Sequence, residues 1–143
     1  MAEATESDLP ELFLQISKRI RRNQATRLAP LGLTPAQSRA LRIIGRAEEP
    51  LRMSALADHL GIVPRSATTV VDALVDADLV TRAPDPANRR STLVVPTEAG
   101  RHTLSLMSQA RREAAAETFA PLADEQRETL RTLLAALDVR ERC

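Results

Sequence analysis

The chain begins with apolar residues repeated at the 3.6-residue period of an amphipathic helix. This spacing predicts a first helix from about Asp8 to Leu28, which the segment Ala29–Gly32 ends. The apolar stripe of this helix consists of Leu9, Leu12, Phe13, Ile16 and Ile20. One side of the helix is therefore expected to pack against another surface.

The C-terminal part repeats this helical pattern. Thr97 is expected to cap a long helix that reaches about Glu117, and Pro121 ends it. Asp124 is expected to cap a last helix. Its apolar stripe consists of Leu130, Leu133, Leu134 and Leu137.

The middle of the chain contains shorter helices with strong start and stop signals. Thr34 followed by Pro35 predicts the start of a helix that ends before Glu48. Ser54 is expected to cap a helix of about two turns, which Gly61 ends in a left-handed conformation. Another helix is predicted from Pro64 to about Ala77.

Strand and turn signals follow these helices. Leu79–Arg82 and Ser91–Val95 read as two strands of a hairpin, and Leu51–Met53 reads as a short edge strand. The intervening Pro84–Arg90 is rich in turn residues and ends in two adjacent Arg residues. We therefore expect a hairpin with a basic tip.

The order of these elements is typical of a winged helix-turn-helix. It predicts a mainly α fold with a small β-hairpin wing, six helices, and N- and C-terminal helices that form a dimerisation region. We treat residues 1–143 as a single domain, with the DNA-binding part at about 33–96 and the dimerisation helices at 8–28 and 98–140.

This fold suggests which residues bind double-stranded DNA. The helix from Pro64 would enter a major groove, where Arg can contact guanine and small hydroxyl side chains can reach bases or phosphates. Arg residues at the wing tip suit a minor groove. The candidate DNA-binding residues are Ser54, Pro64, Arg65, Ser66, Thr68, Thr69, Asn88, Arg89 and Arg90. The alternatives are an ordinary solvated helix face and a solvated turn.

The composition adds little evidence for DNA binding, but it argues against disulfide-bonded proteins, metal-binding proteins and enzymes. The formal net charge is +1, which gives no overall signal for nucleic acid, and Lys18 is the only Lys beside many Arg residues. A GC-rich genome would also favour Arg. The single Cys143 excludes an intrachain disulfide, and the sequence contains no metal-ligand set, catalytic constellation or phosphate-binding glycine loop. We therefore expect no enzymatic activity, no cofactor and no metal.

The stripes on the terminal helices favour a homodimer, because one small DNA-binding unit cannot cover them. The alternative is that these helices fold back and complete a monomeric core. Two-fold symmetry would present two recognition helices to one side of the DNA, roughly 34 Å apart.

The chain shows no signal peptide and no apolar run long enough to span a membrane, so we expect a cytoplasmic protein.

The sequence resembles the MarR family of regulators in several ordered motifs. These are Leu33–Gln37, Met53–Gly61, Asp85–Arg90 and Pro96–Gly100. The resemblance implies a homodimer that binds a short pseudo-palindrome, usually to repress nearby genes, with Arg90 as the wing Arg. Many members release DNA on binding a small molecule, so the resemblance also implies a small-molecule effector.

Some positions differ from the usual family pattern. Gly is common where this chain has Asp78, and Asp is common where it has Asn88. Arg is common at the positions of Thr69 and Ala73, so positive charge is missing from the recognition surface. The peroxide-sensing branch uses a Cys in the first helix, which this chain lacks. A second hypothesis is therefore a winged-helix protein-interaction module without DNA affinity.

Overall fold

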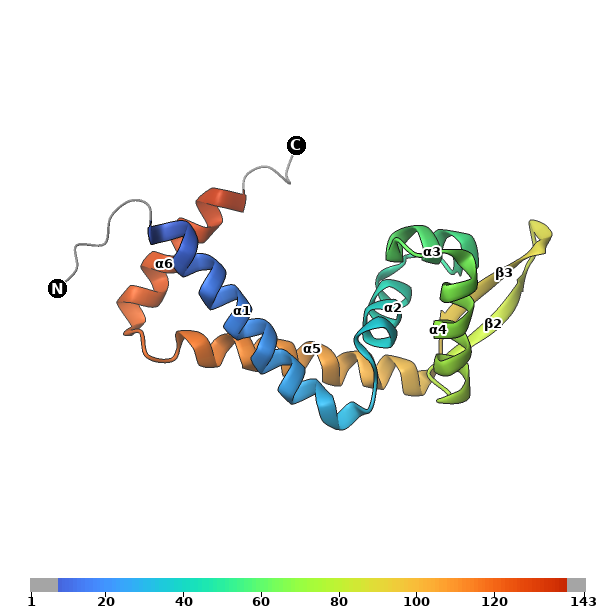
Figure 1. Ribbon diagram of the computed structural model, residues 1–143, viewed down its shortest axis with the longest axis horizontal. Helices are drawn as coiled ribbons and strands as arrows, with labels where there is room; N and C mark the ends of the chain where they lie inside the picture. The colour runs from blue at the N-terminus through green and yellow to red at the C-terminus, as the bar shows by residue number, and fades with distance from the viewer. Residues whose placement is uncertain (1–7, 139–143) are drawn as a thin grey trace. The chain divides into compact units, whose positions relative to one another are not determined.

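The computed structural model describes residues 8–138, and it divides into two compact units (Figure 1). The winged unit consists of residues 28–110. The terminal unit consists of the described residues before and after that segment. Helix α5 (Glu98–Phe119) contributes its first half to the winged unit and its second half to the terminal unit.

The winged unit combines helices with a small sheet. After a short 3-10 turn, η1 (Ala29–Leu31), come α2 (Pro35–Arg46), β1 (Leu51–Arg52), α3 (Met53–Leu60), α4 (Pro64–Asp76), β2 (Val80–Asp85) and β3 (Asn88–Pro96). The sheet is antiparallel with the strand order β1-β3-β2. Thus β3 pairs on both edges, with Val94 opposite Leu51 of β1 and Val95 opposite Thr81 of β2. The predicted winged helix-turn-helix fold is confirmed.

The core of the winged unit is aliphatic. It joins the inner sides of α2, α3, α4, the sheet and the first half of α5. Its most deeply buried large side chains are Leu41, Leu56, Val71, Leu74, Val80, Val94 and Met107. Because no aromatic ring takes part, many small aliphatic contacts hold the helices in place.

Several predicted helix ends are confirmed by their hydrogen bonds. At the start of α2 the Thr34 hydroxyl accepts from the Gln37 amide, and the Gln37 side chain accepts from the Thr34 amide, both at 3.1 Å. Gly61 ends α3 with a φ of 67°. At the start of α5 the Thr97 hydroxyl accepts from the Gly100 amide at 2.9 Å.

Two predicted caps are wrong. Helix α3 begins at Met53 with Arg52 as its N-cap, so Ser54 lies inside the first turn and caps nothing. Helix α6 (Asp124–Leu137) has Ala123 as its N-cap. There the Gln126 side chain accepts from the Ala123 amide at 2.8 Å.

The hairpin differs from its prediction in length. Strands β2 and β3 continue through most of the segment expected to be a turn, since Asp85 pairs with Asn88. A register shift between Pro84 and Asp85 accommodates the tight end. There the Asp85 Oδ1 atom accepts from the Ala87 amide at 2.9 Å and so shapes the turn.

In the terminal unit, polar contacts join α1 (Asp8–Leu28) to α5. Arg27 forms ion pairs with Glu113, at 3.0 Å, and with Glu117. The Gln24 side chain donates to the Arg111 carbonyl at 3.5 Å. Neither α1 nor α6 contains a buried residue, so most of their apolar surface is left uncovered within one chain.

None of the described helices is long and apolar enough to cross a lipid bilayer. Cys143, and the end of the dimerisation segment predicted to reach residue 140, lie outside the described residues.

Candidate nucleic-acid interface

Helix α4 has one buried side and one exposed side. Ala67, Val71 and Leu74 are completely buried against the winged core. The opposite side carries all the candidate residues of this helix, which are exposed: Pro64, Arg65, Ser66, Thr68 and Thr69. The structure therefore brings the predicted residues of α4 onto one accessible surface.

The N-terminus of α4 has no side-chain cap. Its N-cap is Val63, whose side chain cannot accept a hydrogen bond. The Ser66 amide bonds to the Val63 carbonyl at 3.0 Å, and Pro64 has no N–H group. Within the described residues the Arg65 amide is left without a partner, at the end of the helix where a phosphate is favoured.

The hydroxyl donors of the two Thr residues are already used within α4, which the sequence did not show. The Thr68 hydroxyl donates to the Pro64 carbonyl at 3.0 Å, and the Thr69 hydroxyl donates to the Arg65 carbonyl at 3.2 Å. Both hydroxyls keep only their acceptor lone pairs unless the bonds break. Arg65 is therefore the strongest donor on this surface.

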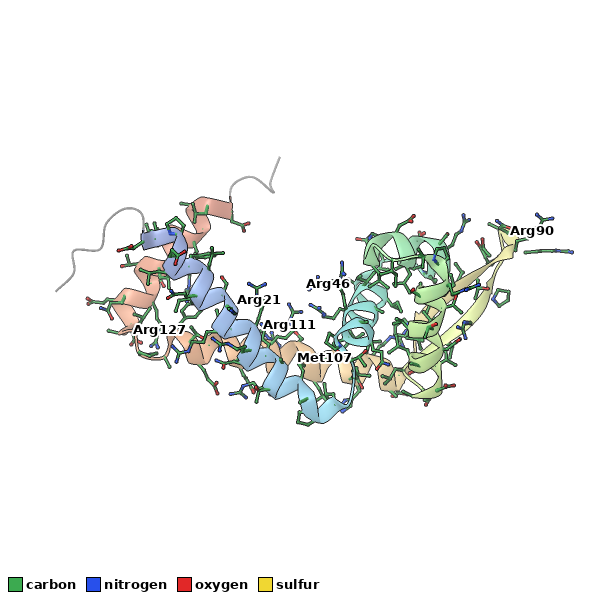
Figure 2. All side chains as sticks on the ribbon, in the orientation of Figure 1. Arg21, Arg46, Arg90, Met107, Arg111 and Arg127 are labelled. Carbon is green, nitrogen blue, oxygen red and sulfur yellow. The ribbon has the colours of Figure 1, made fainter. Side chains whose placement is uncertain are left out.

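The wing presents two Arg residues near its end. Arg89 and Arg90 lie on β3 and are exposed, and Figure 2 shows Arg90 at the distal end of the hairpin. The Asn88 Oδ1 atom accepts from the backbone amide of Arg90 at 3.0 Å. Asn88 thus fixes the backbone of the wing next to Arg90.

The sequence did not reveal the contact that anchors the wing. Asp85 is only 7% exposed and is the one buried polar or charged residue of the described chain. Its Oδ2 atom accepts from the Nε atom of Arg52, in β1, at 2.9 Å. A carboxylate in a turn-rich segment was visible in the sequence, but nothing there indicated Arg52 as its partner.

Two further contacts position the recognition elements. An ion pair between Asp72 and Arg82 links α4 to β2. Arg39, in α2, donates to the carbonyls of His59 and Leu60 at 3.3 Å. These carbonyls lie at the C-terminal end of α3, where the helix itself offers them no hydrogen-bond donor. These contacts fix α3, α4 and the wing within one unit.

Other predicted positions are also accessible. Ser54 is exposed in the first turn of α3.

The described residues contain no group of three or more His, Cys, Asp or Glu side chains that could hold a metal ion. Asp78, where the family often has Gly, has a positive φ of 61°.

The predicted dimerisation residues lie at the surface of the terminal unit. Leu9 is 72% exposed, Phe13 57% and Leu137 76%. Leu12, Ile16, Leu133 and Leu134 are also exposed, whereas Ile20 and Leu130 are half-buried. A hollow of about 690 Å³ in this unit is lined by Phe13, Phe119, Arg127, Leu130, Arg131, Leu134, Ala135, Leu137 and Asp138.

Known proteins share this arrangement. The model of the MarR family matches residues 31–91. An HTH-type transcriptional regulator of Mycobacterium bovis is 33% identical over 137 residues, which cover 92% of each chain. This chain belongs to the MarR family. It is therefore a DNA-binding transcriptional regulator of the winged helix-turn-helix class.

Further relatives of this MarR-family protein support the assignment. An HTH-type transcriptional repressor of Mycobacterium tuberculosis is 31% identical over 134 residues, covering 93% of this chain and 96% of the relative. The crystal structure of a transcriptional regulator from Thermotoga maritima is 27% identical, with a TM-score of 0.81 and 96% of each chain covered.

Proposed function

We propose that this MarR-family regulator binds a pseudo-palindromic operator as a homodimer and represses transcription. Each protomer would place α4 in a major groove and its wing in the neighbouring minor groove. The exposure of Arg65 and Arg90 on two elements of one unit is the observation that carries this proposal.

The chemistry of α4 suits recognition of bases. Arg65 can donate two parallel hydrogen bonds to guanine, and its backbone amide is available for a phosphate. Thr68 and Thr69 offer acceptors and methyl groups to the groove. Because Thr69 and Ala73 lack the positive charge that the family often has there, Arg65 should account for most of the direct reading.

The wing supplies the second contact. Neither Arg89 nor Arg90 forms an ion pair within the described residues. Their charges are therefore available to the negative potential of a minor groove and its bordering phosphates.

The uncovered apolar residues of α1 and α6 support homodimerisation. Several large hydrophobic side chains of the terminal unit are more than half exposed, and a hollow lies among them. Patches of this kind on a soluble protein usually mark an interaction surface. Since a C2 interface uses the same patch on both partners, these residues would be buried by their counterparts in a second copy.

Repression and effector release are the finer parts of the proposal. A relative in Mycobacterium tuberculosis is named a repressor, and family resemblance suggests release by a small molecule. A dimer placed over a promoter would exclude the transcription machinery. A ligand that favours a different spacing of the two recognition helices would release the DNA.

Gel-shift titrations at several salt concentrations test the assignment of the DNA-binding residues. Arg65→Ala should weaken binding to the preferred duplex by roughly 1–3 kcal/mol and relax its base preference. Arg90→Ala should weaken binding to all duplexes and reduce the salt dependence by about one phosphate equivalent per protomer, or about two for the homodimer.

Arg21→Ala is a matched control, because Arg21 is an exposed Arg of the terminal unit (Figure 2). It should bind like the wild type. If the Arg65 and Arg90 variants also bound like the wild type, the proposed interface would be wrong.

A further inference from the structure

A small hollow lies between the start of α3 and the wing. It has a volume of about 250 Å³ and lies wholly within the winged unit. Its lining residues are Arg52, Met53, Ser54, Arg90, Ser91 and Thr92. Two of them are cationic, three carry hydroxyl groups and none is acidic. The volume is that of several water molecules, since a water takes up about 30 Å³ in the liquid.

Arg52 contributes to both the wing anchor and this hollow. Its Nε atom donates to the buried carboxylate of Asp85 at 2.9 Å. Its two Nη groups have no partner within the described residues, and its side chain is 51% exposed. The ion pair therefore fixes the guanidinium while leaving donors available on its outer edge.

The remaining polar side chains of the hollow also have no partner within the described chain. The hydroxyls of Ser54, Ser91 and Thr92 form no hydrogen bond with other described residues. Helix α3 begins beside them and has no side-chain cap. Asp85 compensates the charge of Arg52, whereas Arg90 has no ion pair within the described residues, so the hollow keeps one uncompensated positive charge. With this charge and its unpaired donors, the hollow suits a compact anion with several acceptor oxygens.

We propose that this hollow binds one phosphate group, and that in the cell this is a phosphate of the duplex backbone. The second part rests on the proposed DNA-binding function. Arg52 would then have two tasks, since it holds the wing through Asp85 and contacts the phosphate through its Nη groups. Phosphates border the minor groove, so Arg90 can serve this site and the groove edge together.

The test is a negative charge placed in the hollow without disturbing the anchor. Ser54→Asp is suitable, because Ser54 is exposed and takes no part in the Arg52–Asp85 pair. An acidic residue in the first turn of a helix is favourable, so the variant should unfold at the wild-type temperature or slightly above. Its loss of DNA binding would then not result from misfolding.

Ala99→Asp is the matched control. Ala99 is exposed at the second residue of α5, as Ser54 is at the second residue of α3, and it does not line the hollow. Both variants change the net charge equally.

Binding to a duplex selected by the wild-type protein is measured across salt concentrations. Each phosphate contact contributes about 0.9 to the slope of log K against log salt. A homodimer with two hollows should thus lose about 1.8 in slope with Ser54→Asp. Taking equal binding of the two proteins at 1 M salt as the reference, this slope corresponds to about 60-fold lower affinity at 0.1 M salt. Ala99→Asp should keep the wild-type slope.

A second arm distinguishes a backbone phosphate from a free one. Inorganic phosphate is titrated into each protein while the backbone amides of residues 53–54 and 90–92 are followed by NMR. If these amides shift in the wild type but the duplex slopes of the two variants agree, the site holds a free anion and its assignment to DNA is wrong. Equal slopes with no amide shift overturn the phosphate site itself.

The two proposals can fail separately. If the wild-type protein selects no duplex, the proposed function fails, and the phosphate titration still decides whether the hollow binds an anion.

Discussion

Gly100 is the position at which the structure makes the sharpest prediction about stability. It lies in the first turn of α5, directly after the wing, and is buried. A Cβ atom built there would lie 1.9 Å from the carbonyl oxygen of Leu79. That oxygen is backbone and already accepts from the Thr97 amide at 3.0 Å, so it cannot turn aside.

The magnitude follows from two opposing effects. Ala is favoured over Gly inside a helix by about 1 kcal/mol, so propensity alone predicts that Gly100→Ala stabilises the protein. Overpacking costs about 1–3 kcal/mol, and loss of the Thr97–Leu79 hydrogen bond adds about 1 kcal/mol. We therefore expect a net destabilisation of about 1–3 kcal/mol. The start of β2, which follows Leu79, should also shift.

The assay is urea unfolding followed by circular dichroism at a helical wavelength. Gly45→Ala is the matched control, because the three atoms nearest to its Cβ would all belong to the side chain of Leu104, which can yield by changing rotamer where a backbone carbonyl cannot. That variant should unfold near the wild-type midpoint. A Gly100→Ala protein as stable as the wild type would refute the close packing of α5 against Leu79.

Three further predictions concern the wing anchor, a strained residue and the terminal helices. Asp85→Ala should lower the free energy of unfolding by about 1–3 kcal/mol, measured in urea, because Arg52 and the turn lose a buried acceptor. An unchanged stability would contradict the anchor. Asp78→Gly should raise the free energy of unfolding by about 0.5–1 kcal/mol, since φ is positive there, and a decrease would argue against that conformation. Phe13→Glu should weaken dimerisation more than 100-fold in sedimentation equilibrium, since two buried Phe side chains are each worth about 1.5–3 kcal/mol. Gln15→Glu, an exposed change on the same helix, should remain a dimer, and a dimeric Phe13→Glu would move the interface elsewhere.

The sequence predicted the architecture well because its strongest signals are local. The Thr34–Pro35 start, the Gly61 stop and the Thr97 cap each act within a few residues, and the structure has all three. The two cap errors also have a local cause. Ser54 is the second residue of its helix and Asp124 the first, so each lies just after the N-cap position rather than at it. At the start of α6 the Gln126 side chain bonds to the backbone of the actual N-cap, Ala123.

The parts that could not be predicted depend on contacts between distant segments. Arg52 and Asp85 are far apart in sequence and meet because β3 pairs with β1 on one edge and with β2 on the other. The same pairing forms the hollow beside Arg90. The hydrogen bonds from the Thr68 and Thr69 hydroxyls to backbone carbonyls form only once α4 is helical. The sequence therefore showed that these residues are polar, but not that their hydroxyl donors are already used.

The most direct test of the central claim is selection of binding sequences from random duplexes by the purified wild-type protein. We expect enrichment of an inverted repeat whose half-site centres lie about 10–10.5 bp apart, or a multiple of that spacing, as two symmetric copies of α4 require. Enrichment of an isolated half-site would contradict the homodimer. No enrichment at all would contradict operator recognition and favour a winged-helix protein-interaction module.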